Sequence, residues 1–252
     1  MHRFFLRELF NPLSREFRLS QSDSHYVVRV LRLAPGDRIE LVDKNGNGYI
    51  GEMLVSNPRE VKGRIVETQA FKSAEPETRI TVYQGYPKGR KIETVIEHCV
   101  PVGVSRIVPV FTKRSVIQQE AHFSGTRLTR WRKIAQESAQ VAHRTSIPEI
   151  SEPVTFGQML EEISAQKNHR TTATLMFWEE EKDNHLRDVL DKMAGVRNLS
   201  VIVGPEGGLT RDEASRAEES GVLTVGLGNR ILRTEIAAMV AVVMVMYHRN
   251  EI

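Results

Sequence analysis

The sequence of 252 residues contains one cysteine, Cys99, and no long apolar segment. A single cysteine excludes an intrachain disulfide and any Cys-x-x-Cys metal site. Cys99 lies in the apolar run 95–100, which is typical of a small buried residue. The 8 histidines show no metal-ligand spacing, so we expect no metal site.

Signals for export and membrane insertion are also scarce. The first residues lack the apolar core of a signal peptide, and the longest apolar stretch, 236–247, is too short to span a bilayer. We therefore expect a soluble, cytoplasmic protein. A helix over this stretch is apolar on every side and must be covered on every side, which favours a homodimer.

Several common catalytic motifs are missing. There is no GxxxxGK[ST] loop, and the run Gly226-Leu227-Gly228 lacks both the third glycine of a dinucleotide fingerprint and the acidic residue about 20 positions downstream. The serines show no nucleophile-elbow context. These absences argue against a P-loop enzyme, a nicotinamide enzyme and a serine hydrolase.

Charge is distributed unevenly along the chain. Residues 88–144 contain 11 Lys and Arg against 4 Asp and Glu, whereas residues 145–252 contain 11 against 17. A basic middle region suits a polyanionic partner held along one side of the molecule. We interpret the acidic run 179–181 as a solvated loop.

The pattern of elements predicts two domains, 1–72 and 73–252. The first is mostly strand around the hairpin turn 43–48 and predicts a small β-barrel or curled sheet. From residue 79 onward strands alternate with helices, which predicts a mostly parallel α/β sheet covered on both faces. The expected strands are 80–83, 106–111, 173–177, 200–203 and 223–225, and the expected helices are 91–102, 127–142, 155–164, 185–193, 210–220 and 233–248.

Two glycine-bearing turns follow strand-like runs near the C-terminus. The first is Gly-Pro-Glu-Gly-Gly at 204–208, and the second is Gly-Leu-Gly-Asn-Arg at 226–230. Glycines allow backbone amides to approach a ligand closely. Two such turns at the carboxyl edge of a sheet predict a backbone-lined pocket for a small adenosine-containing ligand.

These two turns, with the run 227–235 that extends the second, closely resemble the signature of the bacterial 16S ribosomal RNA uridine-N3 methyltransferase family, part of the SPOUT superfamily. Weaker matches extend over the whole chain. The resemblance implies an N-terminal PUA-like, RNA-binding β-barrel and a methyltransferase domain with a deep trefoil knot. It also implies S-adenosylmethionine as cofactor, 16S rRNA in the 30S subunit as substrate, and a homodimer.

The same resemblance and the chemistry of methyl transfer assign roles to particular residues. A cation near the uracil oxygens favours loss of the N3 proton, and the candidates in falling order are Arg233, Arg114 and Arg144, with Glu206 or a water as proton acceptor. The expected cofactor-binding residues are Leu175, Phe177, Val203, Gly204, Glu206, Gly207, Leu227, Gly228, Asn229, Ile231, Leu232, Thr234 and Ala237. The expected RNA-binding residues are Arg3, His25, Arg29, Arg32, Lys88, Lys91, Arg132 and Lys133.

The chain departs from the family pattern at Ile236, at Pro101-Val102 and at 141–143. Two alternative functions stay open. One is another RNA methylation on the same scaffold, of transfer RNA or of ribose. The other is a non-catalytic RNA-binding protein of ribosome assembly. A nicotinamide dehydrogenase is a distant third.

Overall fold

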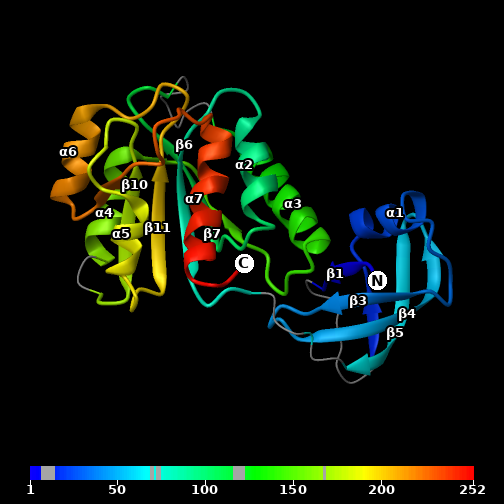
Figure 1. Cartoon of the computed structure of the whole chain (residues 1–252). Coiled ribbons are helices and arrows are strands. Elements are labelled where there is room, and N and C mark those ends of the chain that lie inside the picture. Colours follow the sequence, from blue (N-terminus) through cyan, green and yellow to red (C-terminus); the bar gives the residue numbers. More distant parts are fainter. Residues whose placement is uncertain (7–14, 69–70, 72–74, 116–122, 167–168) are drawn as a thin grey trace. The chain divides into compact units, whose positions relative to one another are not determined.

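The computed structural model describes residues 1–6, 15–68, 71, 75–115, 123–166 and 169–252. The chain forms two compact units (Figure 1). The first comprises Met1–Glu75 and Ala139–Ile147, and the second comprises Pro76–Ser138 and Pro148–Ile252. The first unit therefore takes in a short segment that follows far along the chain. A division of the chain at residue 72 does not include that segment, and this boundary stays a prediction.

The first unit contains a curled sheet of five strands in the order β1-β3-β4-β5-β2. β1 pairs in parallel with β3, and the other neighbours are antiparallel. Helix α1 packs against β4 and β5. The bounds are β1 Arg3–Phe5, β2 Glu16–Arg18, α1 Gln21–Arg29, β3 Arg38–Val42, β4 Gly48–Asn57 and β5 Glu60–Thr68.

The curl of this sheet follows from close packing around Phe17. A Cβ added at Gly51 or Gly63 would come within 2.5 or 2.6 Å of the Phe17 ring. The register of β4 against β5 also shifts twice, and such irregularities bend a strand. The sheet therefore wraps a core that includes Phe4, Phe17 and Val27.

The second unit contains a sheet in which every pair of neighbours is parallel, in the order β12-β10-β11-β6-β7-β8, with β9 also paired to β7. The mostly parallel sheet predicted from alternating elements is confirmed. The strands are β6 Arg79–Gly85, β7 Arg106–Phe111, β8 Glu149–Ile150, β9 Val154–Thr155, β10 Thr172–Phe177, β11 Asn198–Val203 and β12 Leu223–Val225.

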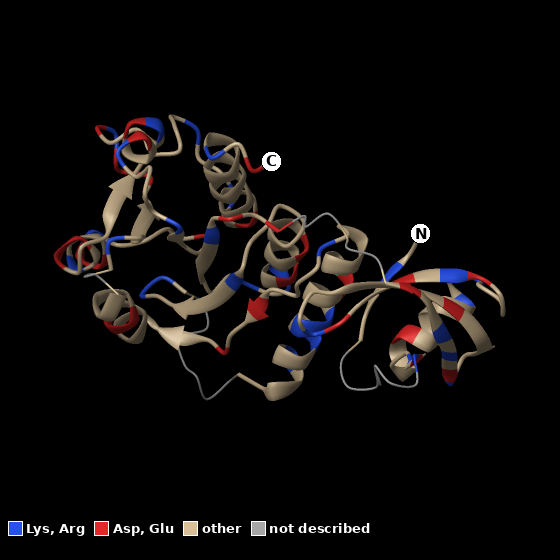
Figure 2. Cartoon of the chain, turned by 90° about the horizontal axis from the view of Figure 1, so that it is seen from below, with Lys and Arg blue, Asp and Glu red and all other residues tan. Residues whose placement is uncertain are grey.

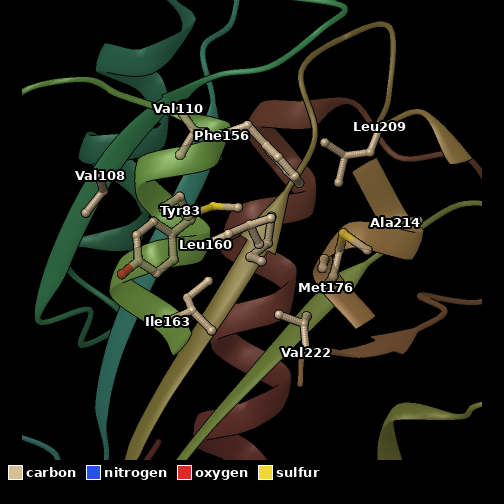
Figure 3. Close-up of a cluster of buried hydrophobic side chains, with 13 residues drawn as sticks. Tyr83, Val108, Val110, Phe156, Leu160, Ile163, Met176, Leu209, Ala214 and Val222 are labelled. Atoms are coloured by element: carbon tan, nitrogen blue, oxygen red, sulfur yellow. The ribbon is translucent and has the colours of Figure 1, made fainter. Parts of the chain in front are cut away.

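Helices pack on this sheet from two sides. α4 and α6 share a core cluster with the sheet, and Figure 3 shows Leu160 and Ile163 of α4 beside Tyr83 of β6. α7 packs against β6, β11 and α2. The helices are α2 Lys91–Cys99, α3 Gly125–Val141, α4 Phe156–Gln166, α5 Leu186–Asp191, α6 Arg211–Glu219 and α7 Thr234–His248.

Local signals predict the helix starts better than the short strands. Thr210 caps α6 in a reciprocal capping box with Glu213, at the start of the helix predicted over 210–220. Thr155 and Gln158 exchange the same kind of hydrogen bonds at the start of α4. β8 and β9 were not predicted, because two residues are too few to show a periodic pattern.

Two expectations about apolar segments can be compared with the structure. Cys99 is fully buried, as predicted, and burial raises the pKa of its thiol to about 12. Across the described parts of the chain, none of the helices has the length and apolar character that crossing a membrane requires.

Candidate active site

Three loops meet at the carboxyl edge of the sheet in the second unit. Residues 178–185 follow β10, residues 204–210 follow β11, and residues 226–233 follow β12 and lead into α7. Because β10 lies between β11 and β12 and all three strands run in parallel, their loops emerge side by side. The two glycine turns predicted to form a pocket are therefore neighbours.

A cavity of about 960 Å³ lies between these loops. All three loops and the first turn of α7 line it, together with Lys91 at the start of α2. This volume is typical of a pocket for a cofactor-sized ligand. Among the described residues, no group of three His, Cys, Asp or Glu side chains is placed to hold a metal ion.

The start of α7 is fastened to the first glycine turn by two side chains. The Thr234 hydroxyl donates to the Gly204 carbonyl at 2.5 Å. Gln84, at the end of β6, donates from its amide to Thr234 Oγ1 at 2.8 Å and to the Gly204 carbonyl at 3.3 Å. Gln84 was not predicted as a site residue, because nothing in its sequence neighbourhood indicates which loop it reaches.

The loop that follows β10 is anchored by Glu181. Its carboxylate accepts hydrogen bonds from the amides of Asp183 and Asn184 and from the Thr224 hydroxyl, and these bonds lower its pKa. The acidic run lies in a largely exposed loop, and within it Glu181 has the additional role of holding the loop and lining the cavity. A Cβ at Gly226 would lie 2.7 Å from the Glu181 carbonyl oxygen, so only glycine fits beneath this loop.

Glu206 binds the start of α2. Its carboxylate accepts hydrogen bonds from Lys91 Nζ at 2.8 Å and from the Lys88 amide at 3.0 Å. Burial alone would raise the pKa of Glu206, but these two donors hold it below its ordinary value. A carboxylate of lowered pKa that is already paired is a weak proton acceptor, which disfavours Glu206 as the general base. Lys91, expected at the RNA backbone, faces this carboxylate.

Two of the three candidate arginines lie near the cavity. Arg233 is exposed and lines it, and no hydrogen bond or ion pair of its guanidinium is found within the described residues. Arg114 donates to the Gly207 carbonyl at 2.8 Å, on the first glycine turn. Arg233 is therefore better placed than Arg114 to meet a ligand inside the cavity.

Most of the expected cofactor-binding residues line this cavity. Two do not: Leu175 is fully buried within β10, and Gly207 is not part of the lining. The residues that do are Phe177, Val203, Gly204, Glu206, Leu227, Gly228, Asn229, Ile231, Leu232, Thr234 and Ala237. Trp178 and Glu235 also line it and were not predicted, because both fall outside the glycine turns that defined the pattern.

Arg144 and Arg3 belong to the first unit, where both are engaged in buried ion pairs. Arg144 pairs with Glu75 at 2.6 Å, and only 4% of its side chain is exposed. Arg3 pairs with Glu40 at 2.9 Å and also donates to the His143 carbonyl. These contacts give both arginines a structural role. A phosphate contact from Arg3 would require its ion pair to open, and a catalytic role for Arg144 stays a prediction.

Of the remaining RNA-binding candidates, Lys88 is exposed just before α2, and the others lie on α1 and α3 or just after α1. His25, Arg29 and Arg32 are exposed on α1 and just after it. Arg132 and Lys133 lie on α3, which carries several basic positions (Figure 2). Arg132 donates to the Ile150 carbonyl at 3.3 Å, and Lys133 pairs with Glu137 at 3.6 Å. RNA contacts by these residues stay predictions.

Comparisons with known proteins agree over nearly the whole chain. Residues 74–246 match the RNA methyltransferase domain family, and residues 19–66 match the RNA methyltransferase PUA domain family. A relative from Bacillus subtilis is 27% identical and is covered over 96% of its length by 98% of this chain. One from Synechocystis is 30% identical, with 88% of this chain covering 70% of it.

A solved structure has the same fold. It is a ribosomal RNA small subunit methyltransferase E from Neisseria gonorrhoeae bound to S-adenosyl methionine, 26% identical, with a TM-score of 0.83 over 98% of this chain and 97% of that one.

With an α/β sheet, a pocket at its carboxyl edge and a matching domain over 173 residues, the chain belongs to the RNA methyltransferase family. The two relatives described above both carry the name ribosomal RNA small subunit methyltransferase E, and this chain is similar in sequence to both over most of its length.

Proposed function

We propose that this protein transfers a methyl group from S-adenosylmethionine to N3 of a specific uridine in the 16S rRNA of the small ribosomal subunit. The observation that carries the proposal is the cavity walled by two adjacent glycine turns. The cofactor-bound relative from Neisseria gonorrhoeae supports the choice of cofactor. A ribosomal substrate implies a cytoplasmic location.

The residues of the cavity fit such a cofactor. Two side chains that line it contain a buried polar atom for which the described residues supply no hydrogen-bond partner: the indole donor Trp178 Nε1 and the carboxylate oxygen Glu235 Oε2. Gly228 has a positive φ of 87° and open space where a Cβ would stand, which leaves room against the backbone.

S-adenosylmethionine supplies a methyl group that is already activated by its sulfonium. The protein's own contribution is to orient the uracil and to stabilise the charge that appears on its oxygens when N3 loses its proton. Arg233 is the residue best placed for this, because its guanidinium is exposed in the cavity lining. The proton goes to water, since Glu206 is paired with Lys91.

A methylation assay tests this function. Labelled cofactor is incubated with isolated 30S particles and, separately, with naked 16S rRNA, and the modified nucleoside is identified by mass spectrometry. We expect N3-methyluridine in the particles. With Arg233→Ala, we expect kcat about 10²–10³-fold lower with cofactor affinity retained. A ribose-methylated nucleoside, or label in transfer RNA instead, would contradict the proposal. Cofactor binding without transfer to any RNA would favour the assembly role.

The proposal includes a knotted chain. After β12, at one edge of the sheet, the chain returns across β10 so that α7 packs on β11 and β6. On the way it runs beneath the loop 178–185, where the Gly226 amide donates to the Asn184 carbonyl. This crossing supports a trefoil knot. An experimental structure tests this. If the two chain ends are joined and the backbone curve is simplified, we expect a trefoil knot to remain, and an unknotted loop would contradict the proposal.

The proposal also includes a homodimer. α7 exposes an apolar face, with exposed fractions of 38% for Ile236, 41% for Met244 and 74% for Tyr247. An exposed apolar stripe of this kind favours a protein partner, and symmetric pairing is the commonest arrangement. We expect the wild-type mass from light scattering to be that of a dimer and Met244→Glu to shift it to a monomer. An unchanged dimer in that variant would place the interface elsewhere.

A further inference from the structure

Two arginines of the second unit share a single carboxylate. Arg90, which precedes α2, donates from Nε to Glu93 Oε2 at 3.1 Å, and Arg130 of α3 donates from Nη2 to the same oxygen at 2.8 Å. Because both bonds end on one atom, the two guanidinium groups lie next to each other. The arginine side chains are 73% and 50% exposed, whereas that of Glu93 is 14% exposed. The carboxylate is therefore largely covered, while both cations stay accessible to solvent.

One carboxylate cannot neutralise two guanidinium groups, so this cluster keeps a net positive charge. Among the described residues, no further carboxylate lies within ion-pair distance of Arg90 or Arg130. Arg127, about one turn before Arg130 on α3, is exposed and donates to the Tyr86 hydroxyl at 3.4 Å, and Lys88 is exposed two residues before Arg90. An exposed ion pair contributes little to stability, so the stability of the fold does not account for a second arginine on one acid. The charge is free to attract an anion.

The two arginines lie beside the cavity. Lys91, the next residue after Arg90, lines the cavity and binds Glu206, and the Lys88 amide donates to the same carboxylate. These bonds fix the start of α2 against the first glycine turn. An anion bound by the two arginines is therefore held at the rim of the cavity.

We propose that Arg90 and Arg130 together bind an RNA phosphate that flanks the target uridine, an inference that rests on the proposed function. A base that enters an enzyme pocket leaves the stack, while its backbone stays at the rim. Each arginine has five N–H donors and uses one of them on Glu93, so the others are available to phosphate oxygens. Glu93 positions both guanidinium groups for this contact.

Methyl transfer into isolated 30S particles, measured at several potassium chloride concentrations, tests this inference. For Arg90→Gln and for Arg130→Gln we expect the KM for the particles to rise about tenfold, because a charge-assisted bond is lost. We expect kcat and the Kd for S-adenosylmethionine to stay unchanged. In the double variant the slope of log KM against log salt should decrease by about one, since one phosphate contact is lost. The two single losses should not add, because both arginines bind the same phosphate.

Arg197→Gln is the matched control. Arg197, just before β11, is 72% exposed and pairs with Glu77 at 3.7 Å. It lies at the amino edge of the sheet, whereas the cavity lies at the carboxyl edge. The variant therefore removes an exposed, paired arginine far from the cavity, and we expect the KM and the salt slope of the wild type. Because all three arginines are exposed, the Tm of each variant should stay within about 2 °C of the wild-type value.

Three results overturn the inference. An equal loss in Arg197→Gln would show that only the overall charge of the protein matters. A higher KM with an unchanged salt slope would assign the two arginines to a non-ionic contact. Methyl transfer by both variants with the wild-type KM and salt slope would contradict this inference alone. Wild-type protein that binds S-adenosylmethionine but transfers no methyl group to 30S particles would instead contradict the proposed function.

Discussion

In the first unit the Arg144 guanidinium and the Glu75 carboxylate lie 2.6 Å apart, and the serine and threonine that follow Arg144 also donate to Glu75. In the cavity of the second unit, by contrast, Glu235 keeps a carboxylate oxygen with no partner among the described residues. Both glutamates are partly buried, yet only one is satisfied by the protein itself. The difference separates a charge that the fold pairs from a charge that the fold leaves unpaired.

The largest expected effect on stability comes from removing Arg144. Arg144→Ala leaves Glu75 without its cation, and breaking a buried ion pair from one side costs about 3–5 kcal/mol. We expect the free energy of unfolding in urea to fall by roughly this amount, with the Kd for S-adenosylmethionine unchanged in the folded protein. If stability is retained and methyl transfer is lost, the catalytic assignment of Arg144 is the correct one.

A smaller effect is expected where the cavity depends on close backbone approach. A Cβ at Gly85 would lie 2.5 Å from the ring and the nitrogen of Pro205. Gly85→Ala should therefore displace the first glycine turn, destabilise the protein by about 1–3 kcal/mol and weaken cofactor binding. Gly125→Ala is the matched control, because it meets no atom within 4 Å and starts a helix, so its Tm should not fall. Equal behaviour of the two variants would refute the close-contact argument.

The smallest expected effect is a difference in pH dependence between Glu75 and Glu206. Burial acts to raise the pKa of both carboxyls. The hydrogen bonds and charges around them, led by Arg144 at Glu75 and by Lys91 at Glu206, together outweigh it, so both pKa values lie below the ordinary 4.5. Since the folded-state pKa is lowered, each group stabilises the protein above about pH 4.5, and this contribution is lost as the pH falls through the folded-state value.

Glu206 is more exposed to solvent, so its contribution should be the smaller. Acid unfolding followed by circular dichroism provides the measurement. Glu75→Gln should flatten the pH dependence more than Glu206→Gln does, and the opposite order would show that the ion pair of the first unit is not the main acid-sensitive contact.

Much of the second unit could be predicted from local patterns. β7 and β12 have the predicted bounds, and the capping box at Thr210 marks the start of α6. The cavity itself could be predicted because parallel strands place their following loops at one edge, which brings two glycine turns together whatever the side chains do. The strands β8 and β9 could not be predicted, since each has only two residues, which are too few to show a periodic pattern.

The sequence by itself determined the alternation of elements and the two glycine turns, because each depends on residues close together in the chain. It indicated a pocket only through the general rule that parallel strands place their following loops at one edge of the sheet. Only the tertiary structure decided which charged side chains are engaged in ion pairs within the protein. Arg3 and Arg144 are basic residues that sequence reasoning assigned to RNA and catalysis, yet they find Glu40 and Glu75, 37 and 69 positions away. Glu235 has a polar oxygen that the fold buries and leaves without a partner among the described residues. Burial and pairing arise from contacts between distant segments, and no local pattern encodes them.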